Sequence, residues 1–393
     1  MSTANVASHA TAVARRPPIR VLLLCQQLDI AGGVERFVCA LANHLAQQGM
    51  DAAIGTVDTP RGAIRYHVDK AVRVLAGSAP RGSPSDAAIS GPARAWALLR
   101  AQWRTGRTLA QLIGRERPDV IVLNGLTTAC SVLLLAPGCA PRVICCDHNH
   151  FEARSALWQT LRAWLYPKVA ALVSLTEADA GRFRALNTNT QVIYNASSLW
   201  ADSPASATGA TVLAVGRCVA QKGFDLLLAA WHTVAARVPS ARLRIVGDGP
   251  LQASLEQRAA QLGITDRIEW IAPTEHIERH YREAAVFVLP SRYEGMPLVL
   301  LEAQALGVPA VAFDCPTGPR EIIESGVTGL VVPALDVPAL AEALQTLLTQ
   351  PALRERMAKA AIERSRARFT PQAHVDRWTS LIRDVAARGV RHA

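Results

Sequence analysis

The feature that most restricts the fold of this chain is a succession of short apolar runs rich in Val, Ile and Leu, separated by helical patterns. Strands are predicted over residues 19–25, 52–57, 72–75, 120–123, 142–146, 171–175 and 191–194, and again over 211–215, 242–246, 267–271, 285–289, 309–313 and 329–332. Continuous rather than alternating apolarity is typical of strands that helices bury on both faces. The sequence therefore predicts an α/β fold of two facing, Rossmann-like, doubly wound domains.

The chain divides at residues 201–209, a stretch of small and polar residues that interrupts this pattern. We expect one Rossmann-like domain over residues 17–200 and a second over 201–370. Residues 1–16 are expected to be a disordered arm, and residues 371–393 a C-terminal helix that packs back across both lobes. Ligands of such sheets bind outside the carboxyl ends of the strands, so the cleft between the domains is the predicted site.

Composition excludes several classes of protein. Half of the 393 residues are hydrophobic, which argues against a disordered chain. No apolar run approaches the roughly 20 residues that a membrane-spanning helix needs. The cysteines follow no metal-ligand spacing, and Cys25, Cys145, Cys146 and Cys218 lie in strand-like runs, so they are predicted to be buried free thiols. We expect a cytoplasmic protein, with peripheral attachment at the inner membrane face as an open alternative.

Positive charge is concentrated in the first half of the chain. Residues 1–200 hold 21 Lys and Arg against 12 Asp and Glu, whereas residues 201–393 hold 21 against 20. Residues 91–117 place Trp96, Leu99 and Trp103 at helical spacing. The same segment contains the basic residues Arg94, Arg100, Arg104, Arg107, Arg115 and Arg117. This combination predicts a basic amphipathic helix.

A second segment, residues 154–168, repeats the mixture with Trp158, Arg162, Trp164 and Lys168. Nucleic acid, an anionic membrane or an acidic small substrate would each suit such surfaces. The structural alternative is a solvated helix whose aromatic side chains face the core. Two such segments in one half favour an anionic membrane surface as a partner, and we expect no nucleic acid.

A glycine pair, Gly32 and Gly33, follows the first predicted strand and opens a helix. Two residues without Cβ atoms allow a phosphate or sugar to approach the N–H groups at the start of that helix. The spacing of a dinucleotide fingerprint or of a P-loop is absent. A plain tight turn is an equally good interpretation of the pair.

Two cations bracket the loop after residues 211–215. Arg217 and Lys222 can converge above the sheet on an anion in the cleft, and a pyrophosphate suits them. The alternative is that both are solvated surface side chains that bind no ligand.

The most informative segment is residues 286–306, a predicted buried strand, a loop and a helix between Pro297 and Gly307. Glu302 is a carboxylate on this otherwise apolar helix, so it needs hydrogen-bond donors, which ligand hydroxyls could supply. Pairing with a local arginine is the structural alternative. Glu294 precedes the helix N-terminus, where exposed amides could hold an anion.

The first half contributes His148 and His150, which follow a predicted buried strand. Either histidine could face the cleft. Asp147 beside them invites a metal interpretation, but this spacing is poor ligand geometry without a third cluster, so no metal site is predicted.

The combination of these motifs resembles the group 1, family 4 glycosyltransferases. The segments that carry the resemblance are Gly216-Arg217 with Gln221-Lys222-Gly223, Val246-Gly247-Asp248-Gly249-Pro250-Leu251, Glu294-Gly295-Met296-Pro297 with Glu302 eight residues after Glu294, and Gly326-Val327-Thr328-Gly329-Leu330-Val331-Val332-Pro333. The resemblance spans most of residues 19–390. It implies a GT-B fold and retaining transfer of a sugar from a nucleotide-sugar co-substrate, with no other cofactor and no bound metal.

The resemblance also implies roles for individual residues. Arg217 and Lys222 would grip the donor diphosphate, beside the turn of Gly32 and Gly33. Glu302 would contact the ribose. The transferred sugar and its phosphate would be held by Glu294 and by the amides of Gly295, Met296, Pro297 and Leu298, a group in which proline contributes no N–H. His148 would lie near the reacting sugar, with His150 as the alternative.

The loop Cys315-Pro316-Thr317-Gly318-Pro319-Arg320-Glu321 departs from the double-glycine form common in the family and looks like a variant seen in enzymes that use UDP-hexoses. The expected donor is therefore a UDP-linked hexose, and the expected acceptor is a saccharide or lipid-linked saccharide bound by the basic first domain. Two alternatives stay open: a nucleotide-sugar epimerase or hydrolase on the same scaffold, and a non-enzymatic polyanion-binding protein.

Overall fold

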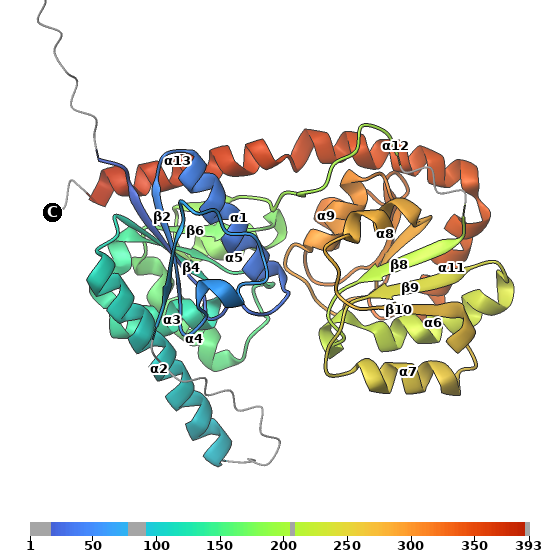
Figure 1. Ribbon diagram of the computed structural model, residues 1–393, viewed down its shortest axis with the longest axis horizontal. Helices are drawn as coiled ribbons and strands as arrows, with labels where there is room; N and C mark the ends of the chain where they lie inside the picture. The colour runs from blue at the N-terminus through green and yellow to red at the C-terminus, as the bar shows by residue number, and fades with distance from the viewer. Residues whose placement is uncertain (1–16, 78–91, 205–208, 390–393) are drawn as a thin grey trace, which may run out of the picture.

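The structure is a computed structural model that describes residues 17–77, 92–204 and 209–389. The arm expected at residues 1–16 and the last four residues of the helix expected over 371–393 lie outside these ranges, and the side chain of Arg94 is not described. The strands form two parallel sheets, one in each of two lobes (Figure 1). We refer to the unit around the first sheet as the first lobe and to that around the second as the second lobe.

The first sheet has seven strands in the order β3-β2-β1-β4-β5-β6-β7. The bounds are β1 Arg20–Leu24, β2 Asp51–Thr56, β3 Arg73–Ala76, β4 Val120–Asn124, β5 Val143–Cys146, β6 Ala171–Ser174 and β7 Thr190–Val192. The helices of this lobe are α1 Gly33–Gln47, α2 Pro92–Glu116, α3 Leu126–Leu135, α4 Ala156–Leu165 and α5 Glu177–Leu186.

The second sheet has six strands in the order β10-β9-β8-β11-β12-β13. The bounds are β8 Thr211–Val215, β9 Arg242–Val246, β10 Ile268–Ile271, β11 Val286–Leu289, β12 Ala310–Phe313 and β13 Gly329–Val332. The helices of this lobe are α6 Phe224–Arg237, α7 Gln252–Gln261, α8 Ile277–Glu283, α9 Leu298–Ala305, α10 Pro319–Ile322 and α11 Val337–Thr349.

All thirteen predicted strands are present, with boundaries that differ by at most two residues. Their continuous apolarity has the expected cause, because β1, β4, β5, β11 and β12 are buried along nearly their whole length. Strand order reverses beside β1 in the first sheet and beside β8 in the second. The loops that follow these strands therefore diverge into a crevice, which is where this architecture places ligands.

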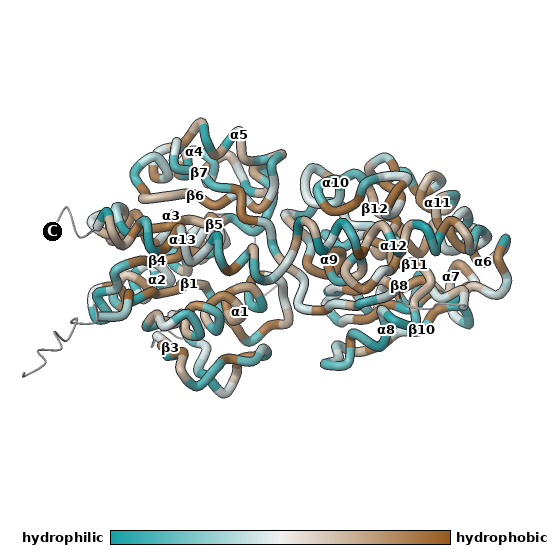
Figure 2. The backbone as a smooth tube through the Cα atoms, turned by 90° about the horizontal axis from the view of Figure 1, so that it is seen from above, coloured by the Kyte–Doolittle hydropathy of each residue, from teal (hydrophilic) through white to brown (hydrophobic). Residues whose placement is uncertain are grey.

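Two helices after the second sheet run along both lobes, as Figures 1 and 2 show. Helix α12, Pro351–Arg368, packs against α9, and α13, Pro371–Gly389, packs against α1 and β4. Helices α12 and α13 together therefore span the two lobes, whereas residues 371–393 alone were expected to do so. Trp378 of α13 is fully buried in a core cluster that also contains Val38 of α1 and Leu301 of α9, so the hydrophobic core is continuous between the lobes.

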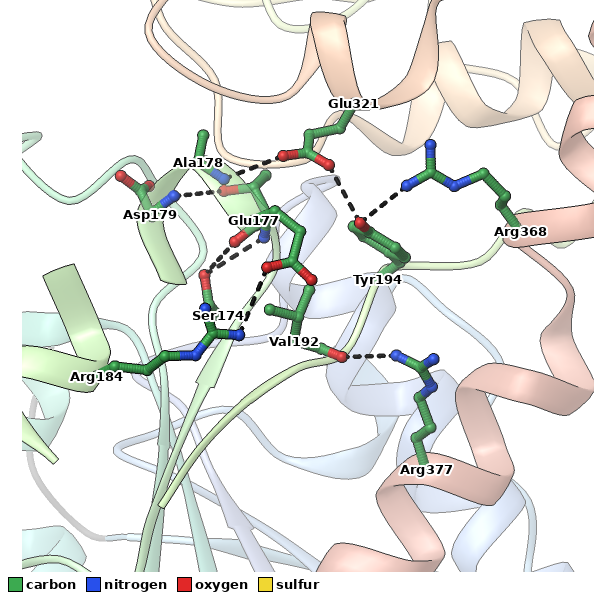
Figure 3. A network of polar contacts seen from close by, with 11 residues as sticks. Ser174, Glu177, Ala178, Asp179, Arg184, Val192, Tyr194, Glu321, Arg368 and Arg377 are labelled. Atoms are coloured by element: carbon green, nitrogen blue, oxygen red, sulfur yellow. Dashed lines mark hydrogen bonds and ion pairs between the residues drawn. The ribbon is translucent and has the colours of Figure 1, made fainter. Parts of the chain in front are cut away.

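Hydrogen bonds join the two lobes near the end of β7, where the chain passes from the first lobe to the second (Figure 3). Glu321 of α10 accepts hydrogen bonds from the backbone N–H of Ala178, at 3.1 Å, and from the Tyr194 hydroxyl, at 3.2 Å. Arg368 donates to the Tyr194 hydroxyl at 3.0 Å, and Arg377 donates to the carbonyl of Val192 at 2.9 Å. The segment after β7 is therefore held from both sides.

The eight cysteines, Cys25, Cys39, Cys130, Cys139, Cys145, Cys146, Cys218 and Cys315, are all free and buried. This confirms the prediction for the four in strand-like runs. Burial raises the pKa of each thiol, for example to about 12 at Cys39, so all eight are neutral at pH 7.

Candidate active site

Two loops of the second lobe meet at the carboxyl edge of its sheet, one after β8 and one after β11. Gly223 ends the first loop with a φ of 64°, and a Cβ atom there would lie 2.0 Å from the carbonyl oxygen of Pro290. Only glycine fits both the left-handed backbone and this contact. Gly223 thus brings Lys222 beside the loop that carries Glu294.

Lys222 and Glu294 form an ion pair, with 2.7 Å between Nζ and Oε1. The Ser291 hydroxyl donates to the same carboxylate oxygen, also at 2.7 Å. Both charged side chains are largely buried, so the pair is strongly held. The structure therefore places Lys222 at the edge of the sheet where it was predicted, with Glu294 as its partner.

Arg217 is exposed, and its charge acts on a carboxylate of the first lobe. The pKa of the Glu35 carboxyl in α1 is raised by burial, and the charge of Arg217 acts in the opposite direction. A cation of the second lobe thus interacts electrostatically with a carboxylate of the first. The predicted role of Arg217 at the donor diphosphate stays a prediction.

Glu302 lies on α9 with only 1% of its surface exposed, and burial raises its pKa. The Tyr281 hydroxyl donates to Oε2 at 2.9 Å. The guanidinium of Arg36 forms an ion pair with Oε1, and Arg36 belongs to α1 of the first lobe. The alternative of pairing with an arginine is thus realised, although this arginine is not local. The ribose role of Glu302 stays a prediction.

Gly295 forms a close backbone contact between the lobes. A Cβ atom on Gly295 would lie 2.3 Å from the carbonyl oxygen of His148. Next to it, Asn195 donates from its side chain to the Met296 carbonyl at 3.1 Å, and Thr317 donates to the Glu294 carbonyl at 2.8 Å. The loop between β11 and α9 is therefore anchored from three directions.

Both candidate histidines line one cavity of about 190 Å³ in the first lobe. The Nε2 atom of His148 lies 3.0 Å from Oδ1 of Asn124, and its ring contacts Phe37 with 4.7 Å between centroids. Burial lowers the pKa of His148 to about 4, so this ring is neutral at pH 7. His150 instead contacts Tyr293 of the second lobe, with 5.7 Å between ring centroids.

The glycine pair opens α1 as predicted, with Gly32 as the residue that caps the helix. The Glu35 carboxylate folds back over this turn, because a Cβ atom on Gly32 would lie 2.3 Å from Oε2 of Glu35. Gly33 faces α9, since a Cβ atom on Gly33 would lie 3.8 Å from the side chain of Leu298. The turn of Gly32 and Gly33 therefore lies where the first lobe meets α9 of the second. The Glu35 carboxylate already occupies the space beside Gly32.

The sequence interpretation missed five side chains of this region: Glu35, Arg36, Asn124, Tyr281 and Ser291. Glu35 and Arg36 directly follow the glycine pair and could have been found there. Nothing local distinguishes the other three, since their roles depend on segments distant in the chain. Within residues 17–77, 92–204 and 209–389, no group of three His, Cys, Asp or Glu residues could hold a metal ion.

Two Rossmann-like lobes that meet at such a site define the GT-B class of glycosyltransferases. The sequence profile of Glycosyltransferase Family 4 matches residues 31–199, and that of Glycosyl transferases group 1 matches residues 200–364. The chain belongs to the group 1, family 4 glycosyltransferases, which confirms the resemblance and the fold.

Individual relatives agree with this assignment. The amylovoran biosynthesis glycosyltransferase AmsD of Erwinia amylovora is 28% identical over 375 residues, which cover 92% of this chain and 99% of AmsD. Sucrose-phosphate synthase (tll1590) from Thermosynechococcus elongatus has a TM-score of 0.79 at 21% identity, over 95% of this chain and 100% of that one. Anabaena Alr3699/HepE in complex with UDP and glucose has a TM-score of 0.73 at 18% identity, over 93% and 100%. These structural likenesses show the GT-B fold alone.

Proposed function

We propose that this glycosyltransferase moves a hexose from a UDP-linked donor to a saccharide or lipid-linked saccharide, with retention of configuration, in glycan synthesis. The observation that carries the proposal is the contact between Gly295 and the backbone of His148 in the other lobe, directly after Glu294, which is paired with Lys222. Arg217 adds a second positive charge, which acts on Glu35, a residue that lines the same cavity as His148. The site thus offers cations, a carboxylate and helix-end amides together.

This arrangement suits the chemistry of the reaction. Cleavage of the bond to the nucleotide leaves negative charge on the diphosphate and oxocarbenium character on the sugar. Arg217 and Lys222 would stabilise the first, so we propose that no metal ion is required. Glu294 would orient a sugar hydroxyl, since its contacts with Lys222 and Ser291 hold the carboxylate in one position.

The donor is tested by thermal unfolding with UDP-glucose, UDP-galactose, UDP-N-acetylglucosamine, GDP-mannose and ADP-glucose, each with and without EDTA. A ligand that binds only the native protein raises Tm by mass action. At least one UDP-sugar should raise Tm, and UDP without a sugar should also raise it. A shift with GDP-mannose only would contradict the UDP assignment, and a shift that EDTA abolishes would contradict metal independence.

The mechanism is tested by proton NMR of the protein with the UDP-sugar that raises Tm, with and without a saccharide acceptor. Transfer with retention gives a product with the anomeric configuration of the donor, read from its anomeric coupling constant. Isomerised donor or free sugar, formed equally well with and without a saccharide acceptor, would instead identify an epimerase or a hydrolase.

The membrane proposal rests on three adjacent helices of the first lobe, which we call the α2–α4 surface. Helix α2 packs on α3, and α3 packs on α4. The exposed large apolar side chains on these helices are Trp96, Leu98, Leu99, Trp103, Leu134, Leu135, Leu157 and Trp164. Trp96 is 66% exposed and Trp103 is 51% exposed, so the alternative in which they face the core is wrong.

Basic side chains accompany these apolar ones. Arg107 lies over the ring of Trp103 at 5.1 Å, and Lys168 lies over that of Trp164 at 3.9 Å. No helix in the described part of the chain is long and apolar enough to cross a bilayer. Exposed indoles beside cations suit the interface of an anionic membrane, where rings enter the headgroup layer and cations meet lipid charge. We propose that the α2–α4 surface rests there and presents the first lobe to a lipid-linked acceptor.

Flotation with vesicles of phosphatidylcholine and phosphatidylglycerol tests this partner. The protein should float with anionic vesicles at low salt and should be released as salt rises. The triple variant Trp96→Gln, Trp103→Gln, Trp164→Gln should lose binding, whereas Leu251→Gln, an exposed apolar residue of the second lobe, should keep it. Absence of flotation with the unaltered protein at low salt would indicate an acceptor in solution.

A further inference from the structure

The ion pair between Arg36 and Glu302 joins the two lobes at the carboxylate expected to hold the donor ribose. We infer that Arg36 competes with the ribose hydroxyls for Glu302, so that a donor must displace this side chain of the first lobe in order to bind. The inference rests on the proposed function, because it concerns the ribose of the nucleotide donor.

The surroundings of Glu302 leave little room for any other arrangement. Its side chain is only 2% exposed. Oε2 accepts from Tyr281, whose hydroxyl also lies 3.0 Å from the Val299 carbonyl and is therefore fixed within the second lobe. Oε1 is the oxygen that faces the first lobe, and Arg36 covers it. A ribose diol can thus reach the carboxylate only after Arg36 withdraws.

The Arg36 side chain can move away from Glu302 toward solvent, whereas that of Tyr281 cannot. Its side chain is 28% exposed, and it also contacts the hydroxyl of Ser198, an exposed residue in the segment that joins the lobes. Tyr281, in contrast, is fully buried. The removable partner of Glu302 is therefore the one that comes from the opposite lobe.

The energetic consequence has a definite sign. A buried carboxylate without its cation is costly, so loss of Arg36 destabilises the free protein. In the complex, ribose hydroxyls donate to the same oxygen of Glu302. Loss of Arg36 therefore destabilises the complex less than it destabilises the free protein. Removal of Arg36 should therefore tighten nucleotide binding, because the fraction of molecules with an accessible Glu302 rises.

Calorimetric titration with UDP and with 2′,3′-dideoxy-UDP tests the inference. Arg36→Met should bind UDP about tenfold more tightly than the unaltered protein, as for a competitor that is removed. Its affinity for the dideoxy analogue should be unchanged, since that ligand has no diol for Glu302. Arg73→Met is the matched control, because Arg73 forms exposed ion pairs within the first lobe with Asp51 and Glu116.

A second variant guards against misfolding of Arg36→Met. In Arg36→Met with Glu302→Gln the buried charge is absent, and UDP affinity should equal that of Glu302→Gln alone. Unchanged or weaker UDP binding by Arg36→Met, or equal tightening for UDP and its dideoxy analogue, would overturn the inference. Failure of the unaltered protein to bind UDP would instead overturn the proposed donor, and the inference with it.

Discussion

The backbone of Gly295 touches the carbonyl group of His148, and no side chain separates the two loops. The distance of 2.3 Å between an added Cβ atom and that carbonyl oxygen is far below van der Waals contact. Because the two residues belong to different lobes, the size of a single residue limits how closely the lobes approach at the site.

Gly295→Ala should therefore separate the lobes locally and impair catalysis more than folding. We expect transfer to fall at least tenfold, as for a displacement of about 1 Å at a reacting centre, with Tm changed little. The measurement is kcat together with Tm. Gly181→Ala, in α5 and without neighbours near its Cβ position, is the matched control and should keep full activity. Full activity of Gly295→Ala would place the reaction elsewhere.

Arg217→Ala should lower kcat by about 10²- to 10³-fold, as when one preorganised charge-stabilising group is lost. Arg217 is exposed, so the fold should be unaffected. Steady-state kinetics with a UDP-sugar measures the effect, and Arg258→Ala, an exposed arginine of α7, serves as the control. Turnover close to that of the unaltered protein would exclude Arg217 from the site.

Lys222→Met should destabilise the protein, because it leaves the Glu294 carboxylate, 5% exposed, without its cation. Loss of a hydrogen bond to a buried charged group costs about 2 kcal/mol. Urea unfolding gives this free energy. The same substitution in a Glu294→Gln background should cost clearly less, and an equal cost would show that the ion pair contributes nothing to stability.

Stability should decline as pH falls below 6.5, in part because of His374. Burial lowers the pKa of His374 to about 4, and its Nδ1 lies 2.8 Å from the Tyr194 carbonyl. Below pH 6.5 the unfolded chain binds a proton that the native state does not bind, so the unfolding free energy decreases as pH falls toward 4. At pH 5 this amounts to about 2 kcal/mol.

His374→Gln keeps an N–H donor but cannot take up the proton. Urea unfolding at pH 7 and pH 5 should therefore show a smaller loss of stability in this variant than in the unaltered protein. The exposed residue His67, changed to Gln, is the control. An identical loss in both variants would mean that other groups account for the decline.

The sequence predicted the fold well because each strand has a local signature. A run such as residues 286–289 is apolar throughout, and the parallel sheet that buries it follows from that pattern alone. The glycine pair after β1, the two cations after β8 and Glu294 after β11 were found for the same reason, since each of these loops carries its motif in a few consecutive residues.

The partners of the site residues could not be predicted in this way. Glu302 is bound by Arg36, which lies in the other lobe and far earlier in the chain, and Lys222 is bound by Glu294 across two loops. The residue types and their spacing identify a buried carboxylate that needs a partner. Tertiary packing decides which of the many arginines becomes that partner. The amphipathic character of α2 was likewise visible, whereas the exposure of its tryptophans depended on which helices cover it.

The burial of all eight thiols leaves the molecular surface without a reactive sulfur atom. Maleimide reagents should leave the native protein unlabelled, so a cysteine introduced on each lobe, at Ala40 and at Gln257, would be the preferred attachment point for a fluorophore. A donor and acceptor dye at these positions would report lobe motion in real time, without any need to delete native residues first.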